Sequence, residues 1–191
     1  MHGILGSSMN KKVVIIHGTK GSPCGNWFPW LAAELRGRGA EVLVPRFPTP
    51  DEQSLDTWLE TFAREAGTVD SNTTIIGHSL GSVFLLRLLE KMQGPIGSSV
   101  FVAGFTSRLG IPEFDELNSS FILPEYNWSS IRRNAGKIFC FSGQDDPYVP
   151  ISQGLELAAE LCVEPILIAG GGHLNAESGY LEFPLLLEKL K

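Results

Sequence analysis

Three residue types that together perform nucleophilic acyl chemistry occur in this chain, each inside a short motif. Ser79 is the centre of GHSLG, an acidic pair formed by Asp145 and Asp146 lies in SGQDDPYVP, and His173 ends the run GGGH. A serine nucleophile needs a base to take its proton, and the base is oriented by an acid. The three motifs therefore predict a nucleophile, an acid and a base, provided that the fold brings them together.

Ser79 stands between an expected strand and an expected helix. The β-branched run TTII precedes the GHSLG motif, and a helical pattern covers residues 82–91. Gly77 and Gly81 lack the Cβ atoms that would clash in so tight a turn. This context is typical of a nucleophile elbow, which would hold Ser79 Oγ at the carboxyl edge of a sheet, above the positive end of the helix. A glycine-rich turn without chemistry is the alternative that the motif alone leaves open.

The base and the acid follow two later strands, in the order Ser, Asp, His. This is the order of the α/β-hydrolases and of neither classical family of serine proteases. In the hydrolase pattern G-x-D-x-x-V-P the acid stands three residues before the valine, which selects Asp146. Asp145 is the second choice, and would otherwise stabilise the turn. Taken singly, acids before a proline often only shape a turn, and a histidine after glycines is often a surface loop residue.

An oxyanion formed by attack of Ser79 needs two backbone donors. We expect one from the N–H of Leu80, the residue after the nucleophile, and the other from Thr19, in the loop after the first strand. His17 and His78, at strand ends, are interpreted as structural histidines rather than bases.

Six apolar strands alternate with helical patterns along the chain. The expected strands are residues 12–17, 41–45, 73–76, 98–103, 137–142 and 164–169, and the expected helices are residues 27–38, 56–66, 82–91, 151–161 and 180–190. The alternation predicts an α/β fold with a parallel, doubly wound sheet, and the continuous apolar strands predict that both faces are covered. Ligand sites of such sheets lie beyond the carboxyl ends of the strands, where all three motifs fall.

Residues 105–136 interrupt the alternation with a long connection that holds a weak helical pattern at 128–134. A connection of this length usually carries function, and we interpret it as a short cap over the site. Aromatic residues are expected to line a small-molecule pocket there. The candidates are Trp27, Phe105, Phe121, Trp128 and Tyr148.

Composition limits the possible partners. The 191 residues fit a single domain (12–191), with residues 1–11 as a flexible N-terminal arm or an expression remnant. The net charge of −6 without a basic run argues against nucleic acid, and no apolar stretch is long enough to span a bilayer. The widely spaced Cys24, Cys140 and Cys162 predict reduced thiols in a cytoplasmic protein, with Cys140 in the core. We expect no cofactor and no metal.

The combination of GHSLG, GQDDPYVP, the late GGH and the short chain resembles the small serine hydrolases related to retinoblastoma-binding protein 9. FTS and LG after the fourth strand add to the resemblance, which extends from about residue 12 to residue 191. It implies a three-layer α/β/α sandwich, a minimal α/β-hydrolase fold with a six-stranded parallel sheet in the order 2-1-3-4-5-6. It also implies a triad at Ser79, Asp146 and His173, and esterase-like activity on small acyl substrates. The loop HGTKGSPCGNW departs from the glycine- and asparagine-rich version of relatives, in the segment expected to supply Thr19.

The sequence thus predicts a serine esterase that cleaves small acyl esters through an acyl-enzyme, with amide and thioester bonds as further options. The alternative is a protein-interaction module on a hydrolase fold with weak or vestigial activity. We expect a small-molecule acyl substrate and a monomer or weak dimer, and a protein partner stays open.

Overall fold

The computed structural model describes residues 11–190 of the chain and contains one parallel β-sheet at its centre. The strands are β1 (Lys12–Ile16), β2 (Glu41–Leu43), β3 (Thr73–His78), β4 (Ser98–Val102), β5 (Lys137–Gly143) and β6 (Ile166–Ile168). Their order is β2-β1-β3-β4-β5-β6, and every neighbouring pair is parallel. The expected six-stranded sheet and its order are confirmed. The expected N-terminal arm, residues 1–11, lies outside the described residues except for its last member.

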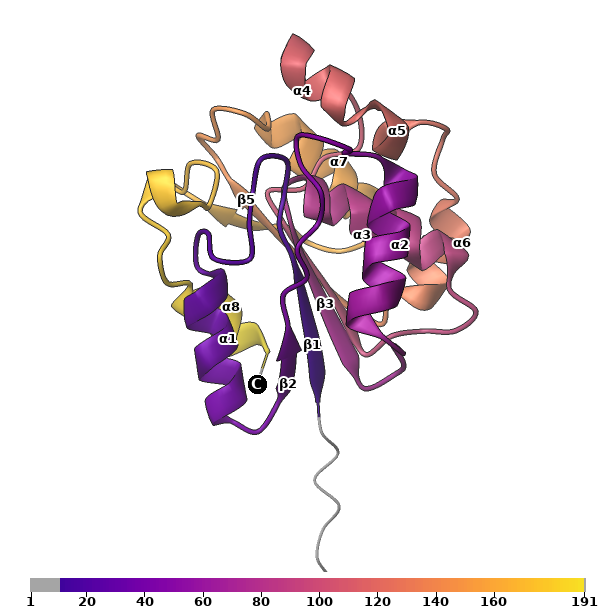
Figure 1. The fold of residues 1–191 in the computed structure, drawn as a ribbon. Helices are drawn as coiled ribbons and strands as arrows, with labels where there is room; N and C mark the ends of the chain where they lie inside the picture. Colours follow the sequence, from indigo (N-terminus) through magenta and orange to yellow (C-terminus); the bar gives the residue numbers. More distant parts are fainter. Residues whose placement is uncertain (1–10, 191) are drawn as a thin grey trace, which may run out of the picture.

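Helices cover both faces of the sheet (Figure 1), so the fold is a three-layer α/β/α sandwich. One face packs against α1 (Phe28–Gly37) and α8 (Pro184–Lys189). The other face packs against α2 (Leu55–Ala66), α3 (Leu80–Lys91), α6 (Trp128–Asn134) and α7 (Ile151–Glu160). Two separate apolar clusters result, one on each side of the sheet.

The strands alternate between these two clusters residue by residue. Val14 and Ile16 of β1 belong to the cluster under α2 and α3, whereas Val13 and Ile15 belong to the cluster under α1 and α8. Because both side-chain directions end in an apolar layer, the central strands are continuous hydrophobic runs, as the sequence indicated. This packing fixes the strand register, and therefore the height at which each strand ends.

The connection between β4 and β5 forms three short helices rather than the one expected. They are α4 (Pro112–Leu117), α5 (Ser119–Ile122) and the expected α6. Arg87 of α3 secures this cap segment: it is buried, it donates hydrogen bonds to the carbonyl oxygens of Phe121 and Pro124, and it pairs with Glu90 at 2.9 Å. Figure 1 shows α4 and α5 beyond the carboxyl ends of the strands.

The C-terminal segment differs from the expectation of one helix over residues 180–190. A 3-10 turn (Ala176–Ser178) follows β6, and α8 begins only at Pro184, a residue that favours the first helical turn because it has no N–H to satisfy. None of the helices formed by the described residues is both long and apolar enough to cross a bilayer.

Candidate active site

Ser79 adopts a strained conformation between β3 and α3. Its backbone has φ 57° and ψ −123°, a combination that a non-glycine residue rarely adopts. The turn is so tight that a Cβ atom on Gly77 would lie 2.4 Å from the carbonyl oxygen of Gly81. A Cβ atom on Gly81 would likewise lie 2.4 Å from the carbonyl oxygen of Ile16. The two glycines are therefore required by close approach of the backbone, and Ser79 is held at the N-terminus of α3.

The loop after β1 lies directly beside Ser79. An atom in the Cβ position of Gly18 would stand 2.8 Å from Ser79 Cβ and 3.2 Å from Ser79 Oγ. The backbone N–H groups of Thr19 and Leu80 make no hydrogen bond within the part of the chain that the structure describes. Two free donors from two different elements thus flank the serine, and Thr19 also lines its pocket.

His173 is held from several sides. Its Nδ1 lies 2.7 Å from Asp146 Oδ2, its N–H donates to Ser178 Oγ at 3.1 Å, and its carbonyl oxygen accepts from His78 Nε2 at 2.9 Å. The side chains of His173 and Asp146 are 9% and 2% exposed. The bond at Nδ1 fixes the neutral ring in the tautomer whose Nε2 is free to accept a proton.

The neighbouring carboxylates of Asp145 and Asp146 accept hydrogen bonds from different groups. Asp146 Oδ1 accepts the N–H groups of Tyr148 and Val149 at 2.9 and 3.0 Å, which leaves Oδ2 for His173. Asp145 Oδ1 accepts the N–H of Gly172 at 3.0 Å and therefore braces the loop that carries His173. The structure thus brings Asp146, and not Asp145, to the histidine ring.

The other two described histidines are buried among hydrophobic groups. His17 Nε2 accepts from Phe47 N–H at 3.1 Å, and its ring packs edge-on against Phe47 and Trp58. Burial lowers the pKa of His17. Burial, together with the nearby His173, lowers the pKa of His78 to about 3. Both rings are neutral at physiological pH.

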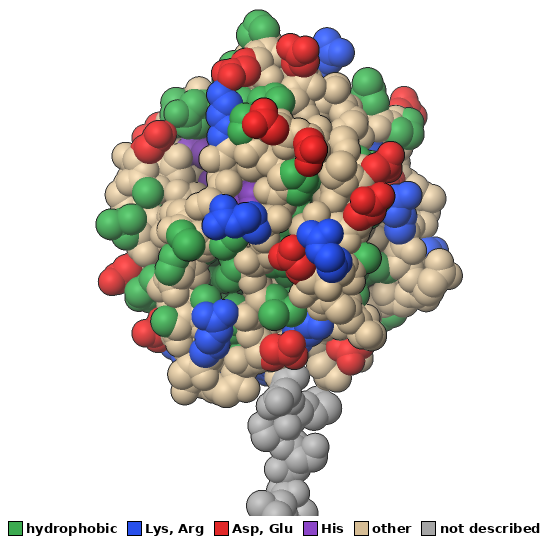
Figure 2. Space-filling model, viewed as in Figure 1, with side chains coloured by type: hydrophobic (Ala, Val, Ile, Leu, Met, Phe, Trp, Pro, Cys, Tyr) green, Lys and Arg blue, Asp and Glu red, His purple; other side chains and the backbone are tan. Residues whose placement is uncertain are grey.

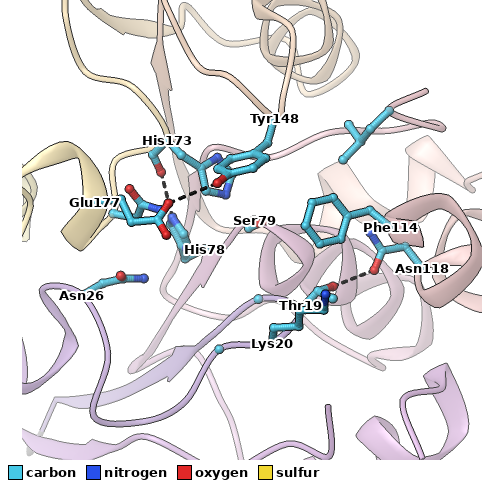
Figure 3. Close-up of a pocket in the computed structure, with 14 residues that line it drawn as sticks. Thr19, Lys20, Asn26, His78, Ser79, Phe114, Asn118, Tyr148, His173 and Glu177 are labelled. Atoms are coloured by element: carbon cyan, nitrogen blue, oxygen red, sulfur yellow. Dashed lines mark hydrogen bonds between the residues drawn. The ribbon is translucent and has the colours of Figure 1, made fainter. Parts of the chain in front are cut away.

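These groups open into one pocket of about 300 Å³ at the carboxyl edge of the sheet. Figure 3 shows Ser79 at its centre, with His173 and Glu177 on one side and Phe114 and Asn118 on the other. In the space-filling view, histidine atoms are visible recessed between other side chains, and acidic and basic groups are interspersed over this face (Figure 2). The lining residues are Gly18, Thr19, Lys20, Gly21, Asn26, His78, Ser79, Leu109, Phe114, Asn118, Tyr148, His173, Asn175 and Glu177.

Of the five aromatic residues expected to line the pocket, the structure places Tyr148 in the lining and the four others outside it. Tyr148 lines the pocket, packs 5.1 Å from the His173 ring and donates its hydroxyl to Glu177 at 3.1 Å. The others are absent from the lining: Trp27, Phe105 and Phe121 are at most 1% exposed, and Trp128 packs against Tyr126 at the start of α6.

The reason is that these rings complete the two apolar layers. Trp27 packs with Phe28 and Phe183. Its indole N–H donates to the Leu174 carbonyl oxygen at 2.9 Å and therefore holds the loop that carries His173. Phe121 packs against Trp58 and Phe84 beneath the cap.

Sequence reasoning missed the polar lining. Asn26 and Lys20 lie in the loop that departs from the family pattern, and Glu177 lies four residues after His173. Asn118 sits in the cap, where the sequence pattern gave no sign of a helix junction. Among residues 11–190 no group of three or more His, Cys, Asp or Glu is arranged to hold a metal ion.

The fold and the geometry of this site indicate the structural class of the protein. The structure superposes on a crystal structure of the ydeN gene product of Bacillus subtilis with a TM-score of 0.88 and 29% identity, over 95% of this chain and 97% of that one. Est1E of Butyrivibrio proteoclasticus shares the fold at a TM-score of 0.68 and 13% identity, over 94% and 90% of the two chains. The architecture is that of the α/β-hydrolases.

Comparison of the sequence with known proteins identifies the family. The family model described as serine hydrolase matches residues 13–191. YdeN of Bacillus subtilis is 30% identical over 184 residues (95% of each chain), and serine hydrolase RBBP9 of Rattus norvegicus is 28% identical over 167 residues (86% of this chain, 87% of that protein). The chain belongs to the serine hydrolase family.

Proposed function

We propose that this hydrolase cleaves small carboxylic esters through an acyl-enzyme, with Ser79 as nucleophile, His173 as general base and acid, and Asp146 as the orienting acid. The observation that carries the proposal is the convergence, in one pocket, of a serine on a strained elbow and a histidine bonded to a carboxylate at 2.7 Å. Within residues 11–190 Ser79 Oγ makes no hydrogen bond; such contacts often tighten only when substrate is bound.

The reaction would run in two halves. Ser79 Oγ attacks the carbonyl carbon while His173 Nε2 takes its proton, and Asp146 stabilises the imidazolium that forms. The N–H groups of Thr19 and Leu80 stabilise the oxyanion. His173 then protonates the departing alcohol, and a water activated by the same nitrogen hydrolyses the acyl-enzyme.

The proposal keeps the expectation of a reaction without cofactor or metal, because the triad itself supplies nucleophile, acid and base. Amide and thioester substrates would use the same steps. A cytoplasmic location stays a prediction from the cysteines: Cys24, Cys140 and Cys162 are free thiols, and burial raises the pKa of the Cys140 thiol to about 12.

A fluorophosphonate probe tests the assignment. It is expected to label the native protein at Ser79 and to abolish turnover of p-nitrophenyl acetate. Ser79→Ala is expected to lose both labelling and turnover while its circular dichroism spectrum is unchanged.

Ser129→Ala is the matched control, because Ser129 is exposed on α6 and does not line the pocket. Equal labelling of Ser79→Ala and the native protein would contradict the proposal. A folded protein without labelling or turnover would favour the interaction-module alternative.

A further inference from the structure

Asn118 is a buried polar residue of the cap whose side chain reaches the active-site pocket. It lies at the junction of α4 and α5 and is 3% exposed, yet it lines the same cavity as Ser79. In the view of Figure 3, Ser79 lies between Asn118 and His173. The mechanism proposed above does not use it.

The orientation of the Asn118 amide follows from a chain of hydrogen bonds that begins at a backbone carbonyl. Gln53 lies within 2.9 Å of the Leu117 carbonyl oxygen, which can only accept, so the Gln53 atom at that position is the donor Nε2. The same Nε2 lies 3.0 Å from Asn118 Oδ1. The Asn118 atom that faces Gln53 is therefore the carbonyl oxygen.

A second series of hydrogen bonds agrees with this orientation of the Gln53 amide. Lys20 N–H donates to Thr49 Oγ1 at 2.7 Å, and Thr49 Oγ1 donates to Gln53 Oε1 at 2.6 Å. This contact is compatible with the Gln53 orientation that the Leu117 carbonyl requires, with Oε1 as the acceptor.

The Thr19 hydroxyl makes the remaining contact. It donates to Asn118 Oδ1 at 2.6 Å, while its own oxygen can accept from Gln53 Nε2 at 3.4 Å. Oδ1 of Asn118 thus receives two donors, and Nδ2 points the other way.

Nδ2 of Asn118 is left as a free donor. It makes no hydrogen bond to residues 11–190, and a buried amide without a partner is costly. Over the same residues the only fully enclosed side-chain polar atom without a partner is the Tyr126 hydroxyl. Nδ2 is therefore not fully enclosed, and because the active-site pocket is the cavity that Asn118 lines, its two hydrogens are available there to a bound molecule.

We propose that Asn118 is a specificity-determining residue that donates a hydrogen bond from Nδ2 to a second oxygen of the substrate. The inference rests on the proposed function. It names the substrate class as small esters that carry an ether, hydroxyl or carbonyl oxygen besides the scissile ester, in preference to purely hydrocarbon esters of the same size. An alkyl ester leaves the amide unpaired when it displaces water from the pocket.

Matched ester pairs test this specificity. For the acyl group the pair is p-nitrophenyl 3-methoxypropanoate and p-nitrophenyl pentanoate; for the alcohol it is 2-methoxyethyl and butyl acetate. The quantity measured is the ratio of kcat/KM within each pair, divided by the ratio of spontaneous alkaline hydrolysis rates. We expect the native enzyme to favour the oxygen-containing member of at least one pair.

Asn118→Asp is the decisive variant, because it keeps an acceptor for Thr19 and Gln53 and replaces only the Nδ2 donor. It is expected to reduce the favoured ratio by about threefold to tenfold, the loss of one hydrogen bond. A general effect of the new charge slows both members of a pair and cancels in the ratio. If this variant does not fold, Asn118→Ala is expected to lose the same preference, with water pairing Thr19 and Gln53.

Two results would overturn the inference: a native enzyme with no preference in either pair, or an unchanged ratio in a folded Asn118 variant. Fluorophosphonate labelling of each variant separates this failure from failure of the proposed function. Labelling at Ser79 with an unchanged ratio contradicts only the role of Asn118, whereas absence of labelling in the native protein contradicts the triad itself.

Discussion

At the scale of single residues, the pocket holds two histidines with opposite environments. His78 is enclosed, neutral, and uses Nε2 to hold the His173 carbonyl at 2.9 Å, whereas His173 bonds to Asp146 and faces the cavity. The rings are 4.9 Å apart. His78 is therefore a positioning residue beside the proposed base, and only His173 has a carboxylate partner.

The acidic pair gives a test with an internal control. Asp146→Asn is expected to lower kcat by about three to four orders of magnitude, because an amide facing Nδ1 favours the wrong histidine tautomer. Asp145→Asn keeps an acceptor for Gly172 N–H and is expected to change kcat by less than about threefold. Steady-state hydrolysis of p-nitrophenyl acetate measures both. A larger loss in the Asp145 variant would reverse the assignment.

The buried His78 makes stability depend on pH. The unfolded chain takes up a proton near pH 6.5, but the folded ring does so only near 3, so between these values the unfolded state binds more protons. The free energy of unfolding is therefore expected to fall as the pH drops below 6.5, by at most about 1.4 kcal/mol per pH unit from this group, and to gain nothing above it. His17, whose pKa is also lowered by burial, acts in the same direction.

Urea unfolding between pH 4 and 8, run on the native protein and on His78→Gln, measures this linkage. The glutamine amide can still donate to the His173 carbonyl oxygen. In this variant the free energy of unfolding is expected to decrease less steeply as the pH falls below 6.5. An identical slope in both proteins would mean that His78 is not neutral in the folded state.

At the scale of elements, the site is assembled from the end of β3, the loop after β1, the loops after β5 and β6, and the cap. The strand-end groups are bound to one another, as in the Asp146–His173 and His78–His173 contacts. The loop after β1 is fixed from two sides, by its close approach to Ser79 and by the Thr19–Asn118 bond to the cap. The position of the proposed Thr19 donor therefore depends on that loop as a whole.

Gly18→Ala tests the loop placement. The added methyl would lie 2.8 Å from Ser79 Cβ and 3.1 Å from the His78 carbonyl oxygen, so the loop must move away from the nucleophile. A displacement of about 1 Å is expected to lower kcat by up to about a hundredfold. Gly37→Ala, at the end of α1 with no atom within 4 Å of the new methyl, is the matched control and is expected to be fully active. Equal activity of the two variants would contradict the placement.

Much of the element pattern could be predicted because strand and turn signals are local. TTIIGHSLG contains its own strand, turn and helix, and D-x-x-V-P encodes the bonds from Tyr148 and Val149 N–H to Asp146. Long connections carry no such signal. Trp27 and Phe121 were expected in the pocket and lie in the core, because an aromatic residue in a loop is apolar enough for either place and only tertiary packing decides.

The polar lining of the pocket was not predicted from the sequence, for a related reason. Asn118 becomes informative only when Gln53 and Thr19, which lie far from it in the sequence, are brought to its side chain. The expected helix over residues 180–190 was wrong at its start, although Pro184 is a local signal for the first helical turn.

At the scale of the whole molecule, the two apolar layers hold the sheet so that every proposed catalytic group emerges at one edge. The strands that carry Ser79, Asp146 and His173 are not all neighbours: β3 and β5 are separated by β4, and β6 is the edge strand. Parallel pairing in register makes these strand ends meet at a common level, which is how residues distant in sequence form one small pocket. Sequence comparison places the chain in the serine hydrolase family, and the covalent chemistry of Ser79 is the central proposal.

Mass spectrometry of the trapped intermediate tests that proposal most directly. The protein is mixed with p-nitrophenyl acetate, quenched in acid during the initial burst, and digested. We expect the added mass of one acetyl group on the peptide that contains Ser79 in the native protein, and no such adduct in Ser79→Ala. Turnover without any acyl adduct at Ser79, or the same adduct yield on another residue in both proteins, would contradict it.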